Sequence, residues 1–139
     1  MQSSTSSPTA LRRALLLDAA ASGTMGLVLA VTAGALEPTL GLPVALLRWV
    51  GIFLLPFAGF LVAVARRPRP PRGAVLTIVV GNALWVVASG LLLLGGRVAP
   101  TPLGEAFVLA QAAAVAVFAW LEYRGLRRAG VSLAAERAA

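Results

Sequence analysis

Four long apolar stretches occupy most of this 139-residue chain, and they constrain its fold more than any other feature. Each stretch is bounded by arginine or by proline and glycine, and the four cover about residues 14–36, 44–65, 73–95 and 103–124. An α-helix needs about 20 apolar residues to cross the roughly 30 Å hydrocarbon core of a bilayer. The sequence therefore predicts an all-α fold: an integral membrane, antiparallel bundle of four transmembrane helices.

The composition supports lipid as the solvent of these helices. Hydrophobic residues make up 59% of the chain and charged residues 12%, against about 25% charged residues in an average soluble domain. A chain this short cannot bury that much apolar surface in one soluble core. We expect the lipid bilayer as a partner and a single transmembrane domain over residues 11–128. The polar segment 1–10 is expected to be disordered, and residues 129–139 are expected to form a C-terminal tail.

The arginines predict the orientation of the helices. All twelve basic residues are arginine, and the formal charge is +7. If the four helices alternate in direction, ten arginines fall on one side, namely Arg12, Arg13, Arg66, Arg67, Arg69, Arg72, Arg124, Arg127, Arg128 and Arg137. Arginine is retained on the cytoplasmic side in short loops, so both termini are predicted to be cytoplasmic, in the cell (inner) membrane. The arginines flank apolar segments and form no basic face, so nucleic-acid binding is not expected.

The first apolar stretch admits a second interpretation. Arg12-Arg13 followed by an apolar segment and Ala33-Gly34-Ala35 is similar to a signal peptide with its cleavage site. The apolar segment is about 22 residues long, whereas the apolar core of a signal peptide has roughly 7–15 residues. It also carries Asp18. We favour a retained span, with cleavage of residues 1–35 left open as the alternative.

The chain lacks several side chains on which enzymes depend. Cysteine and histidine are absent, which excludes disulfides, thiolate nucleophiles, zinc sites of the usual type and haem ligation by these residues. No phosphate-binding loop, zinc-hydrolase motif or serine-hydrolase motif is present. We therefore expect no catalytic residue, no cofactor and no metal, and we expect that the protein is not an enzyme.

A few polar side chains lie inside the apolar stretches. Such groups are costly in a bilayer and are therefore functional candidates; they are Asp18, Ser22, Asn82, Gln111 and Glu122, with Ser89 as a further member. We expect Asn82 and Gln111 to hydrogen-bond near mid-depth, with Asp18 and Glu122 in the cytoplasmic half. Asp18 can also pair with an arginine that reaches back to the membrane rim. Together these polar side chains would form a column inside the bundle. This column is either a path for protons or substrate, or a set of structural contacts worth about 0.6–2 kcal/mol each.

Small residues predict where the first two helices meet. Gly26, Ala30 and Gly34 follow one another at four-residue spacing in the first stretch, and Gly51 and Gly59 lie in the second. Close backbone approach through small residues is a main source of helix association in lipid. We expect these lines to form the seam between the two helices. A homodimer interface, or contact with another membrane protein, is the alternative.

One ion pair is predicted at the outer rim of the bundle. Arg48 near the start of the second stretch and Glu105 near the start of the fourth lie at similar depth. Glu37, in the adjoining connection, is the other acidic side chain within reach of Arg48. We expect Arg48 to form an ion pair with Glu105 or with Glu37.

Two functional hypotheses follow from these observations. The favoured one is a small multi-pass membrane protein that serves as a non-enzymatic structural or accessory subunit. The alternative is a proton-coupled small-molecule transporter that uses the intramembrane carboxylate of Asp18. Neither the substrate nor the partner can be read from the residues.

Overall fold

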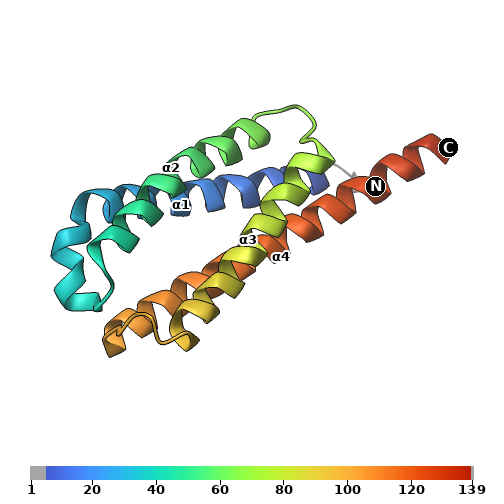
Figure 1. Ribbon diagram of the computed structural model, residues 1–139. Coiled ribbons are helices and arrows are strands. Elements are labelled where there is room, and N and C mark those ends of the chain that lie inside the picture. The colour runs from blue at the N-terminus through green and yellow to red at the C-terminus, as the bar shows by residue number, and fades with distance from the viewer. Residues whose placement is uncertain (1–5, 139) are drawn as a thin grey trace.

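The fold consists of four α-helices. The computed structural model describes residues 6–138, with side chains described for residues 9–130. Its helices are α1 (Ser6–Leu40), α2 (Val44–Ala65), α3 (Arg72–Leu94) and α4 (Pro102–Ala138) (Figure 1). Each helix contains a segment long and apolar enough to cross a membrane. The prediction of four apolar helices is thus confirmed.

The helix bounds match the predicted spans closely in α2 and α3 and exceed them in α1 and α4. α1 begins at Ser6, inside the segment 1–10 for which the sequence predicts disorder, and residues 1–5 lie outside the described part. α4 continues to Ala138, through most of the predicted tail 129–139. Alanine, the residue that most favours helices, is the commonest residue in this last segment. Figure 1 shows the end of α4 projecting beyond the other helices.

The helices form two hairpins that meet along α1 and α4. The first hairpin pairs α1 with α2, and the second pairs α3 with α4. α1 also packs along α4, whereas α2 and α3 scarcely touch. The order in space is therefore α2, α1, α4, α3, and the backbones of α2 and α3 diverge with distance from the connection 66–71 that joins them (Figure 1).

Three small residues form the seam between α1 and α2. A Cβ atom added at Gly26 would lie 3.0 Å from the carbonyl oxygen of Gly51. A Cβ added at Gly51 would meet the backbone nitrogen of Ala30 and lie 2.7 Å from the carbonyl oxygen of Gly26. The predicted seam is correct at these positions. It is wrong at Gly34 and Gly59, where no atom lies within 4 Å of an added Cβ, because the helices are in close contact over only part of the predicted line.

Two other glycines bring α4 against α1, a contact that the sequence did not predict. Gly104 lies against the carbonyl oxygen of Leu40, and a Cβ added at Gly125 would lie 3.0 Å from the Cα of Leu11. These contacts are at opposite ends of the two helices. α1 and α4 are therefore antiparallel and are packed together along their shared length.

The connections 41–43 and 95–101 are tied to each other. Thr101 donates its backbone N–H to the carbonyl oxygen of Leu40 at 3.0 Å and its hydroxyl to the carbonyl oxygen of Thr39 at 2.7 Å. Gly41, with φ of 65°, ends α1 in the left-handed region that glycine adopts without strain. A side chain at Gly41 would also meet the backbone of Ala99.

The other end of the molecule is rich in arginine. Arg12 of α1 donates to the carbonyl oxygen of Arg67, in the connection 66–71, at 3.2 Å. Arg124 lies over the ring of Trp120 with 4.5 Å between its guanidinium carbon and the ring centroid. We call this end, defined by residues 11–13, 66–72 and 124–128, the arginine-rich end.

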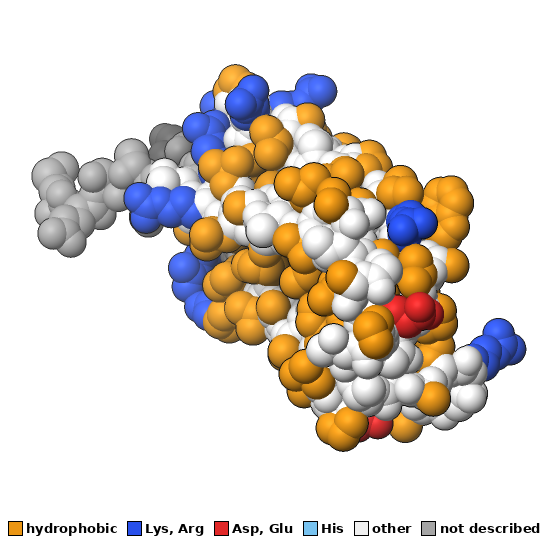
Figure 2. All heavy atoms as spheres, turned by 90° about the vertical axis from the view of Figure 1, so that its left-hand side faces the viewer, with side chains coloured by type: hydrophobic (Ala, Val, Ile, Leu, Met, Phe, Trp, Pro, Cys, Tyr) orange, Lys and Arg blue, Asp and Glu red, His pale blue; other side chains and the backbone are white. Residues whose placement is uncertain are grey.

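Apolar side chains cover both the interior and much of the exterior. One buried cluster, which includes Leu15, Leu61 and Ile78, lies toward the arginine-rich end, and a second, which includes Leu29 and Val108, lies toward the tied connections. Many large hydrophobic side chains face outward as well, and Leu94 is 86% exposed. Hydrophobic side chains spread over most of the face in Figure 2, with arginines mainly toward its edges. This surface suits lipid contact.

Candidate functional site

Four of the predicted polar candidates come together between the two apolar clusters. Asp18 and Ser22 lie one turn apart on α1, Asn82 lies near the middle of α3, and Glu122 lies on α4. Asp18 and Glu122 are fully buried, Asn82 is 3% exposed and Ser22 is 9% exposed. We call these four residues the carboxyl cluster.

Asn82 links the two carboxyl groups. Its side-chain nitrogen Nδ2 donates to Oδ2 of Asp18 at 2.8 Å and to Oε2 of Glu122 at 3.3 Å. Oδ2 of Asp18 and Oε2 of Glu122 both contact this one nitrogen atom, so the two oxygens are at most about 6 Å apart. The hydroxyl of Ser22 donates to the other oxygen of Asp18, Oδ1, at 2.9 Å. One amide group from α3 thus holds α1 and α4 together at the level of their acids.

Among the side chains that the structure describes, no basic group compensates the two acids. Within the described residues, Asp18 and Glu122 form no ion pair, and Oε1 of Glu122 is buried without any hydrogen-bond partner. The predicted alternative, an arginine paired with Asp18, is therefore wrong; Arg12 bonds the backbone of the connection 66–71 instead. Two ionised carboxylates this close in an apolar interior repel strongly. The arrangement therefore favours a proton on the pair, since a proton removes one charge and supplies a donor.

Gln111 does not bond to Asn82, which corrects the predicted pairing of the two amides. It belongs to a second cluster, in which its Oε1 accepts from the indole nitrogen of Trp85 at 2.7 Å and its Nε2 donates to the hydroxyl of Ser89 at 3.0 Å. Trp85 lies on α3 one turn beyond Asn82. The tryptophan therefore takes the place opposite Gln111 for which the sequence predicted the asparagine.

The predicted outer ion pair is not formed. Arg48 is exposed and has no salt bridge to Glu105 or Glu37 among the described side chains. Glu37 instead accepts the backbone N–H of Val44 through Oε1 at 3.3 Å. A carboxylate in this place satisfies a free N–H at the start of α2 and interacts favourably with the helix dipole.

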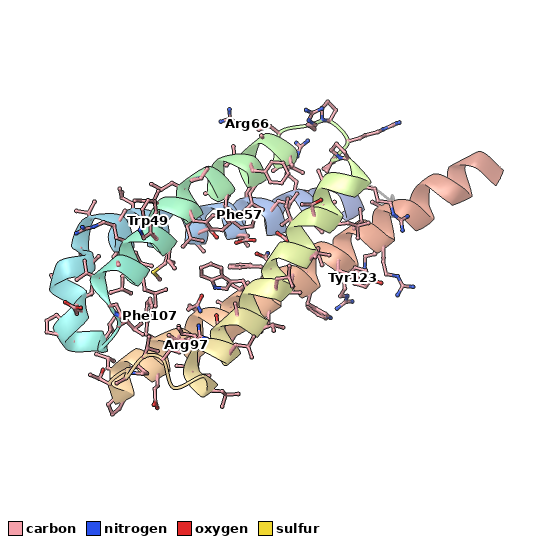
Figure 3. All side chains as sticks on the ribbon, in the orientation of Figure 1. Trp49, Phe57, Arg66, Arg97, Phe107 and Tyr123 are labelled. Carbon is pink, nitrogen blue, oxygen red and sulfur yellow. The ribbon has the colours of Figure 1, made fainter. Side chains whose placement is uncertain are left out.

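A cavity of about 150 Å³ adjoins the carboxyl cluster. Ser22 and Asn82 form part of its wall, and Asp18 and Glu122 lie behind them. Aromatic rings supply much of the remainder, and these are Phe53, Phe57, Trp85 and Phe118. Figure 3 shows Phe57 directed from α2 toward the space between the two hairpins.

A second cavity of about 260 Å³ continues toward the tied connections. Its wall is almost entirely aliphatic and aromatic, apart from the second cluster around Gln111. The two cavities share the wall residues Met25, Leu54, Trp85 and Gln111. They are therefore two parts of one cleft, which lies where the backbones of α2 and α3 diverge and only side chains such as Phe53 and Trp85 meet across the space.

The aromatic wall of this cleft was not predicted from the sequence. The rings of Phe53 and Phe57 lie 6.4 Å apart and 10° from parallel, and those of Phe53 and Trp85 lie 6.5 Å apart and 4° from parallel. The spacing of Phe53 and Phe57, one turn apart on one helix, was the available signal. Its meaning depended on α3 facing α2 across a gap, which local patterns do not reveal.

The described residues contain no group of three acidic side chains that could hold a metal ion. The chain matches no known family model, no curated protein and no solved structure. The functional argument therefore depends on the carboxyl cluster and the cleft.

Proposed function

We propose that this small multi-pass membrane protein is a transporter that couples the passage of a small molecule to proton binding at Asp18 and Glu122. The observation that carries the proposal is the pair of fully buried acids joined by Asn82 and left without a basic partner among the described residues. Ionisable side chains inside a membrane are expensive, by at least about 2.5–3.5 kcal/mol near its centre. An amide or a hydrophobic residue would pack helices at a lower cost than a second carboxyl group.

The cleft beside the pair supports transport over a purely structural role. A polar contact that serves only to join helices needs no space next to it, whereas the wall of this cavity includes Ser22 and Asn82. A molecule in the cavity therefore lies one side chain away from both acids. Such proximity lets the charge of the ligand and the proton on the pair influence each other.

The proposal includes orientation and location. The arginine-rich end lies in the cytoplasm because arginines are retained there, so both termini are cytoplasmic and the protein resides in the cell (inner) membrane. α1 remains part of the mature chain, because Asp18 and the core residues Leu11 and Leu15 belong to it. The protein is not an enzyme, binds no nucleic acid, and needs no cofactor.

Flux into proteoliposomes tests the proposal with many candidate substrates at once. Vesicles that contain the purified protein are given a mixture of small metabolites and a pH gradient in either direction, and their contents are measured by mass spectrometry. We expect at least one compound to accumulate with the wild type and not with Asp18→Asn or Glu122→Gln. Glu105→Gln, which alters an exposed acid, is the matched control and should transport normally. If no compound accumulates in an acid-dependent way, the transporter proposal fails.

The structure also offers one observation in favour of the structural or accessory role. The backbones of α2 and α3 come close at few positions, and Phe53 of α2, which stacks on Trp85 of α3, is 58% exposed. A second copy or another membrane protein can fill such an open side with its own helix. Chemical crosslinking in native membranes distinguishes this role, since it requires a stable larger species, whereas the transporter proposal does not.

A further inference from the structure

The polar side chains around the cleft already use all their N–H and O–H hydrogens in hydrogen bonds within the protein. Asn82 directs both amide hydrogens at the carboxyl groups, and Ser22 gives its only hydrogen to Asp18. Gln111 donates to Ser89 and to the carbonyl oxygen of Val108. Of the described wall residues, none therefore keeps a side-chain N–H or O–H for a ligand, because Trp85 and Ser89 also donate elsewhere.

Acceptors, in contrast, remain available. Oδ1 of Asn82 has no hydrogen-bond partner among the described residues, although the residue is only 3% exposed. The hydroxyl oxygen of Ser22 keeps its lone pairs. Both residues belong to the wall of the 150 Å³ cavity. The site is thus built for a ligand that brings hydrogen-bond donors.

The charge around these acceptors selects a cation. Two acids lie directly behind Ser22 and Asn82 with no basic partner in the described part of the chain. Phe53, Phe57 and Trp85 also line the cavity, and aromatic rings attract a positive charge. The ligand should therefore carry hydrogen-bond donors and a positive charge, and it should bind well against aromatic rings. An ammonium group attached to an apolar body has these three properties.

The size of the cleft fits one such molecule. A cavity of about 150 Å³ with apolar walls is large enough to hold a benzene ring, and this cavity has that volume. The adjoining 260 Å³ cavity has apolar walls that suit a longer hydrocarbon tail. The backbones of α2 and α3 come close at few positions, and Phe53 beside the cavity is 58% exposed, so the apolar body can reach the cavity from this side.

From these contacts we infer that the cleft binds a small primary ammonium ion with an apolar, preferably aromatic, body. The ammonium group donates to Oδ1 of Asn82 and to the hydroxyl oxygen of Ser22, and the body lies among Phe53, Phe57 and Trp85. This inference rests on the proposed function and names the substrate class of the same site. When the ion binds, a carboxyl O–H bond of the pair breaks and the proton leaves to water, so one positive charge replaces another.

The pair is electrostatically isolated enough for this exchange to be measured. Asp18 is the only titratable residue between Arg13 and Glu37, and no titratable residue lies between Arg72 and Arg97. The remaining packed segments, residues 49–65 and 106–121, contain none either. Close to Glu122, Tyr123 and Arg124 are both exposed, and Arg124 lies over Trp120. A change in binding with pH that disappears when both acids are replaced therefore reports on the carboxyl pair.

Three matched compounds test the inference on the purified full-length protein in detergent, by titration calorimetry. They are 2-phenylethylammonium, its N-trimethylated analogue, which keeps the charge and lacks donors, and the neutral 2-phenylethanol. We expect the primary ammonium to bind at least about tenfold more tightly than either analogue, which corresponds to one charge-assisted hydrogen bond. Equal affinity for the trimethylated ion overturns the role of the acceptors, and equal affinity for the alcohol overturns the role of charge.

Variants locate the site and control for misfolding. Asn82→Leu and Ser22→Ala should each weaken binding of the primary ammonium, whereas the control Glu105→Gln should not. Wild-type affinity should rise with pH, since fewer protons compete, and the double variant Asp18→Asn/Glu122→Gln should lose this dependence. Each variant is first checked for a monodisperse profile on size exclusion. Unchanged affinity in folded Asn82→Leu and Ser22→Ala overturns the site.

Failure of this inference is distinguishable from failure of the proposed function. If proteoliposomes accumulate an anionic or neutral metabolite in an Asp18-dependent manner while no ammonium compound binds, the transporter proposal stands and the ammonium assignment is wrong. If a primary ammonium binds with the expected preferences but no flux follows, the assignment stands and transport fails.

Discussion

At the scale of single residues, Asn82 occupies the position where a substitution would remove the most hydrogen bonds from the two acids. It is the only described side chain that hydrogen-bonds to both acids, and it does so with one nitrogen atom. A leucine at this position has a similar volume but no donor. Asp18 and Glu122 would then face each other across a hydrocarbon side chain, and a buried acceptor left without its donor is costly.

We expect Asn82→Leu to destabilise the protein by about 1–3 kcal/mol, because two buried acceptors lose their donor. The measurement is the midpoint of thermal unfolding in detergent, followed by tryptophan fluorescence. Adding Glu122→Gln to Asn82→Leu should recover part of the loss, since it supplies a donor and removes an acid. A single variant as stable as the wild type would show that Asn82 does not hold the pair.

The sequence identified the residues of the carboxyl cluster, but it predicted only some of the hydrogen bonds that these polar residues form. Asp18 and Ser22 could be joined from the sequence because they are one turn apart on a single helix. The choice between Asn82 and Trp85 as the residue opposite Gln111 depends on the rotation of α3 about its axis. α3 is apolar on all sides, so its composition gives no preferred face from which to derive that rotation.

At the scale of helices, glycine determines which pairs approach closely. Gly51 touches the backbone of α1, whereas Gly59 on the same helix faces open space. The two positions were indistinguishable in the sequence, since both lie on a predicted small-residue line. Only the crossing of α1 and α2 separates them.

We expect Gly51→Ala to destabilise the protein by about 1–3 kcal/mol, because the added methyl group would force the two backbones apart. Gly59→Ala is the control on the same helix and should leave stability unchanged or raise it by up to about 1 kcal/mol through its higher helix propensity. Both are measured by thermal unfolding in detergent. Equal loss in the two variants would contradict the seam.

The absence of cysteine makes disulfide crosslinking a clean measure of helix neighbours. A Cβ added at Gly23 would lie 3.4 Å from the Cβ of Ala58, near the separation of about 3.5–4.5 Å found in disulfides. We therefore expect Gly23→Cys/Ala58→Cys to form a disulfide on mild oxidation, detected by its changed mobility on non-reducing gels. Gly59→Cys/Gly81→Cys, at two open positions of α2 and α3, should remain reduced. The reverse pattern would mean that α2 contacts α3 and not α1.

At the scale of the whole molecule, the four-helix content was predictable and the order of the helices in space was not. Length and hydropathy identify each span, because the bilayer fixes the number of apolar residues needed. The short connection also predicts the hairpin α1–α2. Connection length does not separate the pair α3–α4 from the pair α2–α3, since the connection 66–71 is shorter than the connection 95–101. The contact of α1 with α4 joins segments distant in the sequence, and the glycines that form it, Gly104 and Gly125, had no visible partner pattern.

The predicted topology can be checked by labelling single cysteines in intact cells with a membrane-impermeant maleimide. Val98→Cys, in the connection 95–101, should react from outside, whereas Pro70→Cys, between α2 and α3, should react only after permeabilisation. These positions leave every arginine in place, so the charge bias that sets the orientation is unchanged. Reaction at Pro70→Cys in intact cells would reverse the assigned orientation.

Retention of α1 has its own test. A chain with a tag at each end should appear as one full-length species on an immunoblot with either tag, because Asp18 and Leu15 of α1 are buried among the other helices. Loss of the N-terminal tag together with about 35 residues would be the result of signal cleavage, and it would remove one of the two acids from the site.

The hydrogen bonds from Thr101 to the end of α1 have a mechanical consequence. They join the two hairpins at one end of the α1–α4 contact, and the packing of Gly125 against Leu11 joins them at the other. α1 and α4 are therefore held together at both ends of their contact, and α2 and α3 pack on the outer sides of this central pair. α2 and α3 are joined by the connection 66–71, next to which their side chains share a buried cluster. Any change in the width of the cleft should therefore be largest at the opposite end of these two helices and should leave the backbone contacts between α1 and α4 in place.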